Sequence, residues 1–208
     1  MSPTHYQALL LVGPTGSGKT PLGNFLQKSG LWGRRCVHFD FGNQLRNIGN
    51  TVEKPPYLKK EEMAIIVHSL KTGVLLEDDQ FPIAKKILLS FIKNQNVTEK
   101  DLVVLNGLPR HRGQAKDLES IITIKRVVYL ECSPKVVWNR IRFNSGGDRS
   151  LRTDDSFETV RKRWHQFNER TLPLLDYYRT KNIRIVNIKV AVDTKPENIH
   201  DQLLRQRL

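Results

Sequence analysis

Five short apolar runs divide the chain, and each is rich in residues that favour β-strands. The runs are nearly continuous rather than alternating, which is typical of parallel strands buried on both faces of a sheet. Segments with helical spacing separate them. The runs span residues 8–12, 36–41, 102–106, 126–132 and 183–188. This alternation predicts an α/β fold in which a five-stranded parallel sheet carries helices on both faces.

Two of the helical segments carry start signals. Ser133 followed by Pro134 predicts an N-cap and a first helical position. Asp155, with Glu158 three residues later, predicts a capping box at the start of a long helix over residues 155–178, whose apolar positions keep helical spacing.

Two segments interrupt the alternation. Residues 47–73 form a largely helical insertion between the second and third strands, and residues 143–152 form a short loop with glycines and arginines between two helices. Insertions of this kind beside a ligand site are candidates for mobile lids. Since no repeat or low-complexity linker is visible, the sequence predicts a single domain over residues 1–208.

Composition excludes several classes of protein. The chain has 208 residues, of which 38% are hydrophobic and 26% charged, as in soluble globular proteins. No apolar run approaches the roughly 20 residues that a membrane helix needs, and the N-terminus lacks the features of a signal peptide. Two cysteines, Cys36 and Cys132, cannot form a disulfide framework or a four-cysteine zinc site. We therefore expect buried free thiols and a cytoplasmic protein.

The net charge of +13 has two interpretations, a nucleic-acid-binding surface or a cleft lined with arginines for a small polyphosphate. Acidic residues are interleaved with the basic ones, and aromatic residues do not alternate with them as in a base-stacking platform. The pattern favours the cleft, so nucleic acid is the less favoured partner.

The sequence GPTGSGKT follows the first strand and precedes a helix, which is the setting of a phosphate-binding loop. Its glycines allow backbone N–H groups to surround phosphate at a helix N-terminus. Lys19 is expected to bridge the β- and γ-phosphates of ATP, and Thr20 to hold Mg²⁺ through its hydroxyl. The predicted ATP-binding residues are Gly13, Pro14, Thr15, Gly16, Ser17, Gly18, Lys19 and Thr20.

Two further strand ends predict a second phosphate site. DFGNQLR (residues 40–46) ends the second strand and NGLPRHRGQ (residues 106–114) ends the third, so Arg46 and Arg110 should face one cleft at the carboxyl edge of the sheet. Downstream, Asp155, Thr159 and Arg163 have the spacing of one helix face.

These motifs, together with RTDDSFETVRKR (residues 152–163) and PLLDYYRTKN further on, make the sequence similar to the adenylate kinase family of nucleoside monophosphate kinases over nearly the whole chain. The resemblance implies a phosphate-loop kinase fold with two mobile lids. One is a monophosphate-binding lid at about residues 42–73, and the other is a short ATP lid at about residues 143–152.

The resemblance also implies roles for individual residues. The groups around the transferred phosphoryl are Lys19, Arg110, Arg142, Arg152 and Arg163, with Arg149 as the competitor of Arg142. Arg140 is implied to lie against the adenine of ATP. The monophosphate-binding residues are Phe41, Gly42, Arg46, Gly107, Arg110 and Gln114, where Gln114 reads the base and the arginines clamp the phosphate. Asp154 and Asp155 match carboxylates that bond to the lid in the closed state.

Three positions depart from the family pattern. Asn106 stands where the family usually has an aspartate that holds the water shell of magnesium, so we expect contact with Mg²⁺ through water and weaker metal binding or lower turnover. Phe41 replaces a threonine near the monophosphate base, where its ring could stack on the base or crowd it. Asn43 replaces the aspartate that follows.

The resulting hypothesis is an adenylate kinase that converts ATP·Mg and AMP into two ADP by direct in-line transfer. Three alternatives stay open. The first is a kinase for UMP, CMP or dAMP. The second is a catalytically weakened nucleotide-binding relative with affinity for nucleic acid. The third is a kinase for a small molecule that is not a nucleotide, which Gln114 and the second-strand motif disfavour. By resemblance, we expect a monomer.

Overall fold

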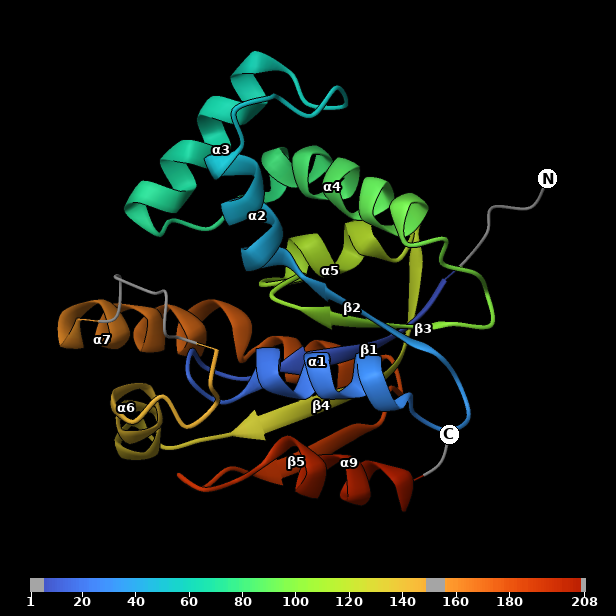
Figure 1. Ribbon diagram of the computed structural model, residues 1–208, viewed down its shortest axis with the longest axis vertical. Coiled ribbons are helices and arrows are strands. Elements are labelled where there is room, and N and C mark those ends of the chain that lie inside the picture. The colour runs from blue at the N-terminus through green and yellow to red at the C-terminus, as the bar shows by residue number, and fades with distance from the viewer. Residues whose placement is uncertain (1–5, 149–155, 207–208) are drawn as a thin grey trace.

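A computed structural model describes residues 6–148 and 156–206. Five strands form one sheet in the order β2-β3-β1-β4-β5, and every pairing is parallel (Figure 1). The α/β fold predicted from the apolar runs is confirmed. The strands are β1 (Tyr6–Val12), β2 (Cys36–Asp40), β3 (Leu102–Asn106), β4 (Ile122–Glu131) and β5 (Ile185–Lys189).

Helices connect the strands in the way that parallel pairing requires. They are α1 (Lys19–Ser29), α2 (Phe41–Asn50), α3 (Lys60–Thr72), α4 (Phe81–Asn94), α5 (Arg112–Leu118), α6 (Pro134–Arg142), α7 (Phe157–Gln166), α8 (Leu174–Thr180) and α9 (Pro196–Leu204). A short 3-10 helix, η1 (Asp78–Gln80), precedes α4, and a π-helical turn, η2 (Phe167–Thr171), separates α7 from α8.

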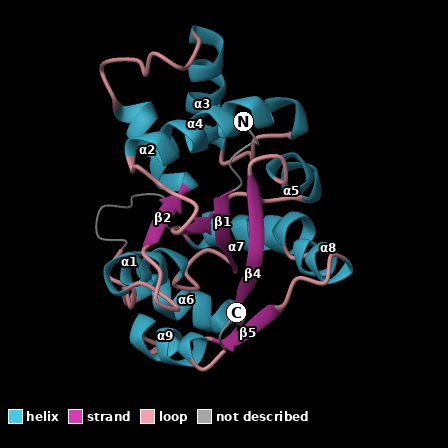
Figure 2. Cartoon of the chain, turned by 90° about the vertical axis from the view of Figure 1, so that its right-hand side faces the viewer, coloured by secondary structure: helices cyan, strands magenta, loops and turns pink. Residues whose placement is uncertain are grey.

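Each face of the sheet supports its own core, because successive side chains on a strand point to opposite faces. On β1, Ala8 and Leu10 pack into the core beneath α2, α4, α5 and α8, whereas Leu9 and Leu11 pack into the core beneath α1, α6 and α9. Figure 2 shows the sheet edge-on, with helices on both sides. All four side chains are at most 2% exposed. Burial on both faces explains why the sequence of β1 is continuously apolar.

The structure moves several predicted boundaries. β4 begins at Ile122 rather than Arg126, because Thr123 and Lys125 alternate with buried neighbours and point to solvent. The long helix is divided by η2, where the amide of Leu172 donates to the carbonyl of Phe167. Its N-cap is Ser156, which accepts from the amide of Thr159.

The predicted insertion between β2 and β3 is helical. It contains α2 and α3, which contact each other, and α3 lies beyond α4 at the top of Figure 1. Within residues 6–148 and 156–206, no helix is long and apolar enough to cross a membrane.

Candidate active site

The ends of three adjacent strands meet at one cleft. In the parallel pairing, Asn106 at the end of β3 is level with Leu11 of β1 on one side and with Asp40 of β2 on the other. The phosphate loop follows β1, and α2 follows β2 directly. A cleft of about 430 Å³ lies at these strand ends, and all three residues line it. Parallel sheets bind ligands at this edge.

The phosphate loop has the backbone geometry that its glycines allow. Gly16 and Gly18 have φ angles of 76° and 97°, a region that favours glycine, and Gly18 is the N-cap of α1. The ammonium of Lys19 donates to the carbonyls of Gly13 at 2.6 Å and Pro14 at 2.7 Å. The loop therefore places a cation and the positive end of a helix beside one another, which is an environment for phosphate.

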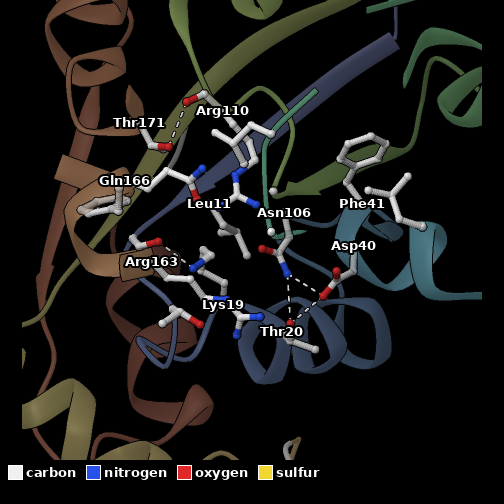
Figure 3. Close-up of a pocket in the computed structure, with 18 of the residues that line it drawn as sticks. Leu11, Lys19, Thr20, Asp40, Phe41, Asn106, Arg110, Arg163, Gln166 and Thr171 are labelled. Carbon is white, nitrogen blue, oxygen red and sulfur yellow. Dashed lines mark hydrogen bonds between the residues drawn. The ribbon is translucent and has the colours of Figure 1, made fainter. Parts of the chain in front are cut away.

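Thr20, Asp40 and Asn106 form a hydrogen-bonded triangle beside the loop (Figure 3). The hydroxyl of Thr20 donates to Oδ2 of Asp40 at 2.6 Å. The amide nitrogen of Asn106 donates to the same Oδ2 at 2.8 Å and to Oγ1 of Thr20 at 3.1 Å. A carboxylate only accepts, so the amide of Asn106 must turn its nitrogen toward Asp40 and its oxygen away.

Asp40 is a site residue that the sequence reasoning missed. Its other oxygen, Oδ1, accepts from the amide of Asn43 and caps α2. The available signal was an acidic residue at the end of an otherwise apolar strand next to the phosphate loop. The family pattern directed attention to Asn106 instead.

The triangle has the chemistry of a Mg²⁺ site. Magnesium prefers oxygen ligands and retains several waters, and here a hydroxyl and a carboxylate lie together, while the amide oxygen of Asn106 is turned away from Asp40. No group of three or more histidine, cysteine, aspartate or glutamate side chains that could hold a metal occurs among the described residues. A cation at this position would therefore depend on nucleotide phosphate and water for its remaining ligands.

Two arginines face the cleft from opposite elements. Arg110, after β3, and Arg163, on α7, both line it. Burial, together with repulsion by Arg163, lowers the pKa of Arg110 to about 10, while Asp40 opposes that shift. Two guanidinium groups held together in a cleft favour an anion between them.

The backbone of Arg110 is held on both sides. Its amide donates to Oε1 of Gln114 at 2.9 Å, and its carbonyl accepts from the hydroxyl of Thr171 at 2.9 Å. Thr171 lies in η2, so the π-helical turn contributes directly to the position of this arginine. Arg46, from α2, lines the same cleft. The structure therefore brings together Lys19, Arg46, Arg110 and Arg163, as expected from their motifs.

Gln114 and Phe41 line the cleft but make their main contacts within the protein. Gln114 is 1% exposed, and its side-chain nitrogen donates to the carbonyl of Leu76 at 2.8 Å. The ring of Phe41 is stacked against Phe39 with centroids 6.0 Å apart, and Phe41 is 4% exposed. Gly42 and Gly107 also line the cleft.

Arg140 lies behind the phosphate loop. It is 4% exposed, and its Nε donates to the carbonyl of Gly16 at 3.2 Å. Its Nη1 donates to the carbonyls of Ala191, Val192 and Thr194 at 2.8, 3.0 and 3.1 Å. This guanidinium thus joins the loop to the segment between β5 and α9. These contacts support the loop, and the expected position of Arg140 against adenine stays a prediction.

The remaining arginines of the predicted site are less constrained. Arg142 is exposed at the end of α6, with its guanidinium 5.8 Å from the centroid of the Phe143 ring, and it is not among the cleft-lining residues. Arg149, Arg152, Asp154 and Asp155 lie outside the described residues.

Known proteins resemble this chain over most of its length. The family model described as "Adenylate kinase" matches residues 11–183. The chain belongs to the adenylate kinase family. It is therefore a phosphotransferase of the nucleoside monophosphate kinase class.

The proteins that this chain resembles differ in the substrate that their names give. A uridylate kinase from Saccharomyces cerevisiae is 24% identical over 200 residues, covering 96% of this chain and 89% of the relative. An adenylate kinase from Treponema denticola is 28% identical, covering 86% and 90%. A gluconokinase crystal structure from Sinorhizobium meliloti shares the fold, with a TM-score of 0.53, 17% identity, and coverage of 97% and 91%.

Proposed function

We propose that this member of the family is an adenylate kinase that converts ATP·Mg and AMP into two ADP. The observation that supports the proposal best is the convergence of Lys19 from the phosphate loop with Arg46, Arg110 and Arg163 on one cleft. Four cations from four separate elements suit the negative charge of the ATP triphosphate and of the AMP phosphate that faces it.

The proposed reaction is a direct displacement. An oxygen of the AMP phosphate attacks the γ-phosphorus of ATP, the bond from that phosphorus to the β–γ bridging oxygen breaks, and its electron pair stays on ADP. Lys19 would exchange its contacts with Gly13 and Pro14 for phosphate oxygens, and Arg110 would hold the acceptor phosphate with a planar fork. A bound Mg²⁺ would neutralise charge on the β- and γ-phosphates.

AMP is the favoured acceptor because Gln114 occupies the position of the base-reading glutamine. Both of its side-chain groups already bind backbone, to Arg110 and Leu76, so base recognition would use its second N–H and its second lone pair. Phe41 packs against Phe39, which does not support a stacking role for its ring. UMP, CMP and dAMP are the alternatives, since one similar protein is named a uridylate kinase.

Two further aspects of the proposal concern where and with what the protein acts. Cys36 and Cys132 are both buried free cysteines, which fits a reducing compartment such as the cytoplasm. ATP and a nucleoside monophosphate would be its partners, and we propose that a monomer is sufficient because the four cations come from one chain.

A coupled assay for diphosphate formation tests the proposal. Purified protein with ATP and Mg²⁺ is given AMP, CMP, UMP, GMP or dAMP in turn. We expect turnover with AMP above that with the other acceptors, and its loss in Lys19→Ala. Turnover with UMP or CMP alone would replace the proposed substrate, and silence with all five acceptors despite ATP binding would refute catalysis.

A further inference from the structure

The acidic group at the metal site has an unexpected location. The family pattern places a carboxylate at the tip of β3, where this chain has Asn106. The structure shows a carboxylate one strand away, on Asp40 at the tip of β2, within 2.8 Å of the Asn106 amide and 2.6 Å of the Thr20 hydroxyl.

We propose that Asp40 supplies the negative charge for the Mg²⁺ that accompanies ATP, and that Asn106 is its neutral partner. This inference rests on the proposed function, because it concerns the metal of that same reaction. It extends the function by assigning the carboxylate to a residue that the family motif does not mark.

The first argument is the position of Thr20. The Thr20 hydroxyl donates its proton to Asp40 at 2.6 Å and accepts from the Asn106 amide at 3.1 Å, so one lone pair of its oxygen remains for a cation. The same bond places the carboxylate next to the metal-binding hydroxyl, where a charge can orient the water ligands that Mg²⁺ retains.

The second argument is that, without a cation, two carboxylates at the tips of β2 and β3 would repel each other. Asp40 and Asn106 are level in the parallel pairing, and their polar atoms are 2.8 Å apart. Two carboxylates at that separation repel, and in the absence of a cation one of them takes up a proton. An amide opposite a carboxylate donates to it instead. Asn106 is thus the residue that an acidic Asp40 requires.

The test compares five proteins: the natural chain, Asp40→Asn, Asp40→Ser, Asn106→Asp and the double exchange of Asp40→Asn with Asn106→Asp. The probe is Mn²⁺ binding to the complex of protein and a non-hydrolysable ATP analogue, measured by electron paramagnetic resonance. Asparagine caps helices as well as aspartate does, so Asp40→Asn keeps the start of α2. Asp40→Ser is a second neutral variant that also retains a capping side chain.

We expect Asp40→Asn and Asp40→Ser to weaken Mn²⁺ binding about 10- to 100-fold, as for other groups that orient metal ligands. Affinity for the ATP analogue in EDTA should stay within about threefold, because the proposed role of Asp40 requires the metal. For comparison, a tenfold change corresponds to about 1.4 kcal/mol. The double exchange should regain most of the Mn²⁺ affinity. Asn106→Asp alone should lower the thermal midpoint in EDTA, and nucleotide with Mn²⁺ should restore it.

Unchanged Mn²⁺ binding in both neutral variants would overturn the inference, as would an equal loss of affinity for the analogue in EDTA. Failure of the double exchange to recover Mn²⁺ binding would also overturn it. The outcome is separable from the proposed function. If the variants lose Mn²⁺ binding as expected but the natural chain phosphorylates no monophosphate, the metal assignment stands and the proposed function fails. If the natural chain turns over but Asp40→Asn binds Mn²⁺ normally, the proposed function stands and the metal assignment fails.

Discussion

Arg170 of η2 donates two hydrogen bonds to the carboxylate of Glu77, at 3.1 and 2.6 Å. The residues on either side of Glu77 also contact the protein body. The carbonyl of Leu76 is 3.0 Å from Nε2 of His111, and Asp78 is 3.1 Å from Nδ1 of the same histidine. The segment after α3, residues 76–78, is therefore bound to the start of α5 and to η2.

The Glu77–Arg170 pair should contribute modestly to stability. The hydrogen bonds from Arg170 lower the pKa of Glu77 below its ordinary value of 4.5. Both side chains are about half exposed, so a double-mutant cycle with Glu77→Gln and Arg170→Met should give a coupling of about 0.5–1 kcal/mol at neutral pH.

The sign of the pH effect follows from the lowered pKa. The coupling should be fully present above about pH 4.5, the ordinary value, and be lost as the pH falls through the lower value in the folded protein. Urea denaturation across this range measures it. The more exposed pair Arg179–Asp176 is the matched control and should couple less. A coupling that persists at the lowest pH would contradict this assignment.

Arg110 should discriminate between the two nucleotides. Arg110→Lys retains a charge but loses the planar fork, and should raise KM for the monophosphate about 10- to 100-fold, equivalent to about 1.4–2.8 kcal/mol, with KM for ATP within about threefold. Steady-state kinetics with each substrate varied in turn measures both constants. Arg179→Lys, on the exposed face of α8, is the control. Equal increases for both substrates would show that Arg110 is not specific to the monophosphate side.

The charge of Arg110 also predicts a flat pH response. Its pKa, although lowered, is about 10, so the guanidinium stays protonated at neutral pH. KM for the monophosphate should be constant between about pH 7 and 8.5, because ionisation begins to matter only near the pKa.

Arg140 should act on the phosphate loop and not on the base. Arg140→Met removes a buried guanidinium that donates to four carbonyls, of which that of Ala191 keeps a second donor in the amide of Thr194. The change should cost about 2–4 kcal/mol of unfolding free energy. Affinities for ATP and for inorganic tripolyphosphate should fall by the same factor, as calorimetry can show. A loss confined to ATP would instead indicate contact with adenine.

Phe41 should matter for stability more than for base selection. Phe41→Leu removes part of a buried ring and should cost about 1–2 kcal/mol in chemical denaturation, between the cost of losing one methylene and that of truncation to alanine. The ratio of kcat/KM for AMP and UMP should change less than about twofold, well under the 1.4 kcal/mol of a tenfold preference. Phe91→Leu is the control, because Phe91 also packs against Phe39, edge to face with centroids 5.1 Å apart. A reversed substrate preference in Phe41→Leu alone would place the ring on the base.

The sequence predicts those parts of the fold that depend on local pattern. The apolar runs locate all five strands, and burial on both faces leaves a continuous signature in β1, β2 and β3. The phosphate loop is recognisable because its glycines and Lys19 have fixed spacing. Arg46, Arg110 and Arg163 could also be predicted, since each lies at a strand end or on a helix face that points to the sheet edge.

Other features depend on register and orientation, which spacing does not specify. The neighbour of Asn106 is set by the pairing of β2 with β3, so the contact between Asp40 and Asn106 becomes visible when the two tips are aligned. Arg140 lies on the expected helix, α6, yet its guanidinium donates to carbonyls between β5 and α9 that are distant in sequence. The division of the long helix by η2 leaves no clear trace in the apolar spacing.

The arrangement of one acid and one amide at adjacent strand tips also constrains how such a site can change over time. Moving the acid between β2 and β3 takes two substitutions, and each possible intermediate has a defect. With two acids, the tips repel until a cation binds; with two amides, α2 keeps a capping side chain but the charge is missing. If Asp40 supplies the charge at the metal, we expect selection to act on the two positions as a pair.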